Sequence, residues 1–174
     1  GNLQKAASIL AEAGKKTGAD PEIRKKSLVF AAAASVRQGN FEEAAGLYKT
    51  YADTFSSDQL VPFITLKLAE LYIRDLHLWE PGLRIIREFL ASQTAHFLAP
   101  RARFLYATGL DVSGRSAEAV KRYSQVRDLY PWSDWAQKAG DRLDAGPPAL
   151  DLSLRQDTGS PESLLPQQSV STET

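Results

Sequence analysis

The chain contains no cysteine and no methionine, and only two of its 174 residues are histidine. The lack of cysteine excludes disulfides, thiolate nucleophiles and cysteine-ligated metals. No uninterrupted apolar run approaches the roughly 20 residues that cross a bilayer, so we expect no membrane span in this chain.

The charge balance carries no excess of either sign. Lysine and arginine together number 21, and so do aspartate and glutamate. The longest basic run, Arg24-Lys25-Lys26, suits the solvated face of a helix. We therefore expect no nucleic-acid partner.

Residue patterns for catalysis are also missing. His77 and His96 are isolated, without a second histidine four residues away. The sequence has no Gly-x-Ser-x-Gly motif, no glycine-rich phosphate loop and no kinase signature. We expect no catalytic residue, no metal and no cofactor, so the chain is not expected to be an enzyme.

A short phrase recurs along the chain. Gly39-Asn40-Phe41-Glu42-Glu43-Ala44-Ala45 resembles the opening segment 1–7, and degenerate copies lie at 77–82 and 114–119. The small residue that closes each copy recurs at steps of 38, 38 and 37 residues, at Ala6, Ala44, Gly82 and Ala119. Such self-similarity predicts a repeat architecture. Because the chain opens inside a repeat and without methionine, we expect a fragment or a processed form.

Each copy has the residues of a turn between two antiparallel helices. Gly39 can adopt a positive φ, Asn40 can cap the next helix, and Glu43 can complete a capping box. Apolar residues then follow at helical spacing. Helices are predicted over about 1–13, 21–38, 41–55, 59–76, 79–92, 100–112, 117–130 and 131–145, with Asp20 and Ser116 as caps and small residues at the helix crossings (Ala31 to Ala34, Ala69 and Ala107). The segment 59–76 is apolar on most sides, which places it centrally.

These features resemble the tetratricopeptide repeat family. The positions of Ala107, Gly114, Ala119, Tyr123 and Pro131 match its pattern. The resemblance implies an all-α fold, a right-handed superhelical α-solenoid of stacked antiparallel helix pairs, with about three repeats plus a terminal cap helix. The chain departs from the family at Ser56 and Thr94, where proline is usual, at His77, where glycine is usual, and in its period, which exceeds 34 residues.

A second resemblance concerns the segment 123–143. Its Tyr130-Pro131-x-Ser133-x2-Ala136-x2-Ala139 phrase is similar to the long-repeat tetratricopeptide domains of bacterial envelope proteins, including an outer-membrane assembly lipoprotein and a Tol-Pal-associated periplasmic protein. This implies a location in the bacterial periplasm or at the outer membrane, with the cytoplasm as the alternative.

The family resemblance also implies a binding surface. In such proteins the first helices of successive pairs line a concave groove that holds a peptide or helix of a partner protein. The residues expected to line it are Lys26, Val29, Arg37, Phe63, Leu66, Glu70, Arg74, Arg101, Phe104, Thr108 and Asp111. Both asparagines, Asn2 and Asn40, belong to turns, which argues against the clamp that binds chaperone tails.

The leading hypothesis is therefore a non-catalytic protein-interaction scaffold within a bacterial envelope complex. One alternative is self-assembly into a homo-oligomer through the half-repeat 1–13. Another is the interaction module of a larger cytoplasmic regulatory protein. For Trp79, Trp132 and Trp135, packing between helices is favoured over contact with a partner.

The composition divides the chain at residue 146. Residues 1–146 form the predicted helical domain, and 147–174 are rich in proline, serine and glutamine. We expect this tail to be mostly disordered, because it can bury too little apolar area to offset the entropy of ordering. The alternation of Leu150, Leu152 and Leu154 leaves open a short docked extended segment.

Overall fold

The computed structural model describes residues 2–16, 18, 20–92 and 96–146. Within that part of the chain the protein is all-helical, which confirms the predicted fold class at this level. Most predicted ends agree to within two residues, but the last helix begins three residues later than expected. The eight helices are α1 (Asn2–Lys15), α2 (Pro21–Arg37), α3 (Phe41–Thr54), α4 (Val61–Arg74), α5 (Trp79–Ser92), α6 (Ala99–Val112), α7 (Ser116–Leu129) and α8 (Asp134–Asp144).

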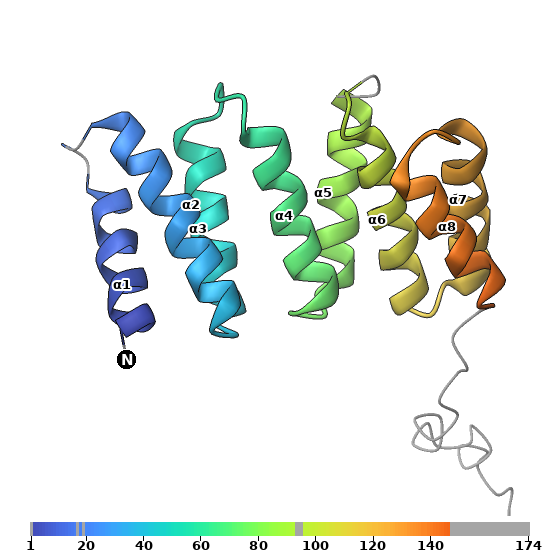
Figure 1. The fold of residues 1–174 in the computed structure, drawn as a ribbon, viewed down its shortest axis with the longest axis horizontal. Helices are drawn as coiled ribbons and strands as arrows, with labels where there is room; N and C mark the ends of the chain where they lie inside the picture. Colours follow the sequence, from blue (N-terminus) through green and yellow to red (C-terminus); the bar gives the residue numbers. More distant parts are fainter. Residues whose placement is uncertain (1, 17, 19, 93–95, 147–174) are drawn as a thin grey trace, which may run out of the picture.

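The helices form a row that follows the chain order (Figure 1). Each helix packs against the one before it and the one after it. In addition, α4 contacts α6, and α6 contacts α8. The even-numbered helices of this half of the row therefore share one face of the molecule.

Small residues sit where neighbouring helices cross. Ala69 and Ala107 are fully buried, and so are Ala44 and Ala119 to within 1%. Gly82, at the same place in the repeat, is also buried. The burial agrees with the crossings predicted at Ala69 and Ala107. Of the predicted stretch Ala31 to Ala34, Ala31 and Ala32 are buried, but Ala33 is exposed. The side chain of Ala6 lies outside the described residues.

The turns repeat with the same period. Gly39 and Gly114 have φ values of 77° and 82°, and His77 takes a φ of 53° in the turn between them. A positive φ favours glycine. His77 therefore adopts the same left-handed backbone conformation as Gly39 and Gly114, although it is not a glycine. The positive φ predicted for Gly39 is confirmed.

Two of the three predicted caps are wrong. The Asp20 carboxylate accepts from the amides of Glu22 and Ile23, as expected. Asn40 makes no such bond, because its ψ of 67° departs from the extended backbone of a capping residue. Ser116 is the first helical residue of α7 rather than its cap.

Glu43 does not complete a capping box either. Its carboxylate accepts a hydrogen bond from the buried Ser35 hydroxyl at 2.9 Å. Because Ser35 lies on α2, the carboxylate links the two helices of a pair instead of closing the start of its own helix.

No helix of the described residues is long and apolar enough to cross a membrane. The predictions for the tail 147–174 fall outside the described residues.

Candidate functional site

The shared face of α4, α6 and α8 carries one stripe of side chains from each helix. We call it the even-helix face. Residues spaced three and four apart lie on one side of a helix, which is why each stripe faces the same way. The stripes comprise Phe63, Lys67, Glu70 and Arg74 on α4, Arg101, Phe104, Thr108 and Asp111 on α6, and Trp135, Lys138 and Arg142 on α8.

Arg101 joins the three helices of this face. Its guanidinium carbon lies 5.3 Å from the centroid of the Phe63 ring and 5.8 Å from that of the Trp135 ring. It also donates to the Glu70 carboxylate at 2.8 Å. Only 14% of the Arg101 side chain is exposed. A cation between two aromatic faces and a carboxylate is held in one position, so this part of the face is pre-organised.

Glu70 gathers three cations. Besides Arg101, Lys67 Nζ lies 3.4 Å and Arg74 Nη1 3.5 Å from its carboxylate oxygens. Partial burial on its own would raise the pKa of Glu70, but the combined attraction of Lys67, Arg101 and Arg74 lowers it below its ordinary value. The carboxylate is therefore ionised at neutral pH and stays bound to its cations.

A second ion pair fastens α8 to α6. Arg142 donates to the buried carboxylate of Asp111, which also accepts from the Ser116 hydroxyl at 3.3 Å. The hydrogen bond to Asp111 raises the pKa of Arg142. Next to this pair, the Tyr123 hydroxyl donates to Thr108 Oγ1 at 3.2 Å, and burial raises the pKa of Tyr123.

A hollow opens on this face at the C-terminal ends of α4 and α6, with a volume of about 490 Å³. Arg74 and Arg142 flank it, and the ring of Phe104 forms part of its wall. Its lining is Ile73, Arg74, His77, Trp79, Phe104, Thr108, Val112 and Arg142. An apolar hollow between two cations suits an apolar side chain in an acidic segment.

The three stripes together carry an excess of positive charge. Five cationic side chains stand against the carboxylates of Glu70 and Asp111, both of which are already paired. The cations are Lys67, Arg74, Arg101, Lys138 and Arg142. Lys138 lies over the Trp135 ring, with Nζ 4.2 Å from the centroid.

Most of the residues predicted for a groove converge here. Phe63, Glu70, Arg74 and Arg101 reach the surface of the even-helix face. Phe104, Thr108 and Asp111 are more than nine-tenths buried and lie beneath it, although Phe104 and Thr108 still line the hollow.

The other predicted residues lie apart from this cluster. Leu66 is completely buried and belongs to the core. Lys26, Val29 and Arg37 lie on α2, and none of the ion pairs or ring contacts among the described residues joins them to the rest.

Sequence reasoning missed four residues of this face: Lys67, Trp135, Lys138 and Arg142. The last three follow helical spacing, Trp135-x2-Lys138-x3-Arg142, on a helix in the same alternation as α4 and α6. That spacing was a usable signal. The packing role expected for the tryptophans holds for Trp135, which lies 5.3 Å from Phe104, and is wrong for Trp132, which is 78% exposed.

The two histidines and the acidic residues can be examined for a metal site. Among the described residues, no three histidine, aspartate or glutamate side chains are grouped so that they could hold a metal ion. His96 Nδ1 accepts a hydrogen bond from the amide of Leu98 at 3.1 Å, and its ring stacks on Phe97.

No family model matches the chain, and no curated protein matches it.

Proposed function

We propose that this chain is a tetratricopeptide-like solenoid and a non-catalytic scaffold that binds an acidic segment of a partner protein on its even-helix face. The recurrent positive-φ turns and the contacts between alternate helices support the solenoid, in the right-handed form that the family resemblance implies. In that arrangement the even-helix face corresponds to the concave groove of the family.

The observation that carries the proposal is the position of Arg101 between Phe63, Trp135 and Glu70. Aromatic and arginine side chains are enriched among residues that dominate binding energies. Fixing them before a partner arrives reduces the entropy lost on binding. The surplus of cations beyond Glu70 and Asp111 favours a partner segment that carries carboxylates.

The proposed location is a bacterial envelope complex, in the periplasm or at the outer membrane. It is supported by the envelope-type phrase around Tyr130-Pro131. Fractionation of the source cells with an antibody against the chain tests this part separately. Recovery with the cytoplasmic proteins would refute the location and leave the binding face to be tested by itself.

Photo-crosslinking tests the binding face. The photoreactive amino acid p-benzoylphenylalanine is placed at Phe63, which is 39% exposed, so that one aromatic ring replaces another. The matched control places it at Val120 on α7, which is 43% exposed and lies outside the even-helix face. We expect a defined protein adduct from position 63 in the source cells and none from position 120. Equal adducts from both positions, or none from position 63, would contradict the proposal.

Self-association is a second candidate, because α2, the second helix of the row, leaves apolar side chains uncovered. Ile23 and Phe30 are 57% and 61% exposed and, seven residues apart, lie on the same side of the helix. A second copy could stack there. Sedimentation at increasing concentration would show a dimer that Phe30→Glu abolishes; a monomer throughout would exclude this candidate.

A further inference from the structure

The opposite side of the row has two grooves that correspond to one another in the repeat. One lies between α3 and α5 over α4, and the other between α5 and α7 over α6. Five lining positions of the first recur 38 residues later in the second: Lys49, Ala52, Thr65, Leu68 and Arg84 become Arg87, Leu90, Arg103, Tyr106 and Arg122. The repeat therefore places two versions of one site side by side.

The two versions differ in charge. In the α3–α5 groove, Lys49 and Arg84 are accompanied by the carboxylates of Asp53 and Glu88. The residues 38 positions after those two acids are Ala91 and Val126, which carry no charge. The lining of the α5–α7 pocket thus contains three arginines and no carboxylate.

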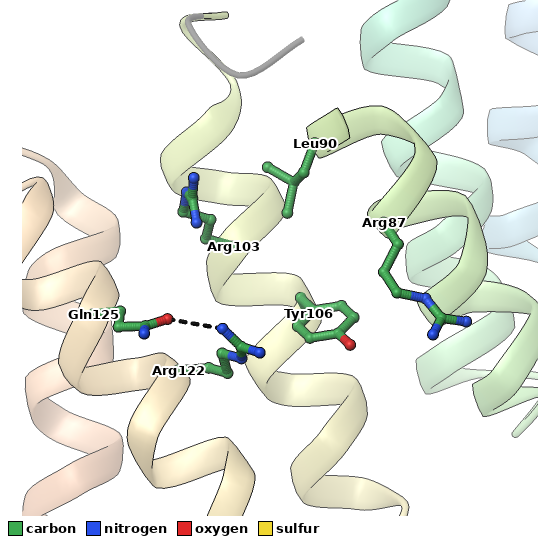
Figure 2. Close-up of a pocket in the computed structure, with 6 residues that line it drawn as sticks. All are labelled: Arg87, Leu90, Arg103, Tyr106, Arg122 and Gln125. Atoms are coloured by element: carbon green, nitrogen blue, oxygen red, sulfur yellow. Dashed lines mark hydrogen bonds between the residues drawn. The ribbon is translucent and has the colours of Figure 1, made fainter. Parts of the chain in front are cut away.

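Six side chains from three helices surround the α5–α7 pocket (Figure 2). Arg122 donates to Gln125 Oε1 at 3.1 Å, and its guanidinium lies 5.8 Å from the centroid of the Tyr106 ring. Arg103 donates through Nε to the Tyr130 hydroxyl at 3.0 Å. In the described part of the chain, none of these arginines forms an ion pair. The lining residues are Arg87, Leu90, Arg103, Tyr106, Arg122 and Gln125.

We propose that the α5–α7 pocket binds a phosphate monoester, that is, a phosphate group carried on an organic group. Figure 2 shows the three guanidinium groups directed apart, with the Tyr106 ring between those of Arg87 and Arg122, so binding requires the exposed Arg87 and Arg122 side chains to turn toward the ligand. Together the three groups carry more positive charge and more donors than one carboxylate can satisfy, whereas a phosphate dianion offers three terminal oxygens as acceptors. Arg103 uses one N–H group in its hydrogen bond to Tyr130, and Arg122 uses one in its hydrogen bond to Gln125. The remaining N–H groups of both guanidiniums can donate to a ligand.

The size and lining of the pocket fit this ligand. Its volume of about 230 Å³ lies below the roughly 300–1,000 Å³ of sites that enclose drug-sized molecules, so a small group is indicated. Leu90 and the Tyr106 ring give it an apolar wall beside the arginines, against which the organic group can pack. This site is separate from the even-helix face and does not depend on the function proposed for that face.

Calorimetric titration of the full chain at fixed ionic strength tests the assignment, with phenyl phosphate and inorganic phosphate as probes. We expect saturable one-to-one binding of phenyl phosphate and weaker binding of inorganic phosphate, which leaves Leu90 and Tyr106 uncovered. Arg87→Gln and Arg122→Gln should each weaken phenyl phosphate binding about tenfold or more, as for a lost charge-assisted hydrogen bond. Both residues are exposed, so circular dichroism should show unchanged folding.

The control is Arg84→Gln, the same change at the repeat-equivalent arginine of the α3–α5 groove. It should leave the affinity within about twofold, since it lies outside the pocket. Loss of affinity equal to that of Arg122→Gln would show a general effect of charge and overturn the site. Absence of saturable binding would also overturn it. Equal affinity for the two probes would refute the contribution of the organic group.

Discussion

Gly82 of α5 lies so close to Ile73 of α4 that a Cβ added to it would approach Ile73 Cγ1 to 2.6 Å. Gly82→Ala therefore forces α4 and α5 apart or distorts Ile73. We expect a net loss of about 1 kcal/mol in the free energy of unfolding, because overpacking costs about 1–3 kcal/mol while alanine returns up to about 1 kcal/mol of helix propensity. Urea denaturation followed by circular dichroism measures it.

Gly46 of α3 is the control for this prediction. A Cβ there meets no atom within 4 Å. Gly46→Ala should therefore raise the free energy of unfolding by about 0.5–1 kcal/mol. If both substitutions stabilise the protein, the close approach of α4 and α5 at Gly82 is wrong.

Asp58 should make stability depend on pH in acid. Its carboxylate pairs with Lys25 Nζ at 2.7 Å and accepts from the Leu60 amide and the Tyr51 hydroxyl, both at 2.8 Å. The Lys25 bond, followed by the other two, lowers the pKa of Asp58 to about 2. A folded pKa below the unfolded one gives stability that is present above about pH 4 and is lost as the pH falls from about 4 toward 2.

Asp58→Asn lacks this contribution. The difference in free energy of unfolding between the two proteins should be largest near neutral pH and shrink as the pH falls through this window. Urea titrations at several pH values between 7 and 2.5 give the difference directly. A difference that stays constant over this range would show that Asp58 does not titrate as the structure implies.

The Asp111–Arg142 pair should couple α6 to α8. Removing the carboxylate with Asp111→Ala loses a hydrogen bond to a charged group, so we expect a cost of about 1.5–3 kcal/mol in the free energy of unfolding. After that change, Arg142→Ala should cost little more. A double-mutant cycle measures this coupling; additive effects of the two substitutions would mean that the pair contributes nothing.

Local patterns predicted the helices well and the surface less well. Helix length and the 38-residue period follow from the spacing of apolar and small residues, which can be read directly from the sequence. Whether a side chain faces the surface depends on the rotation of its helix: Leu66 and Lys67 are neighbours about 100° apart, and only Lys67 reaches the even-helix face.

The helix caps and α8 also show that local sequence patterns do not determine three-dimensional geometry. A cap needs particular backbone angles as well as a suitable residue, so Asn40 could not be judged from its identity. Because α8 was expected to be only a terminal cap, Lys138 and Arg142 were not considered as part of the surface, and Trp135 was expected to pack between helices rather than to contact a partner, although α8 contacts α6. The spacing of these three residues shows that they share one side of α8, but which helix that side faces depends on the packing of alternate helices.

The binding face can be tested most directly with the protein captured from position 63. Its affinity is measured for the original chain and for two tryptophan variants, Trp135→Ala in the even-helix face and Trp132→Ala in the exposed turn before α8. We predict that Trp135→Ala weakens binding about tenfold or more, with helicity retained, and that Trp132→Ala leaves it unchanged. Equal affinity of the original chain and Trp135→Ala would contradict the account.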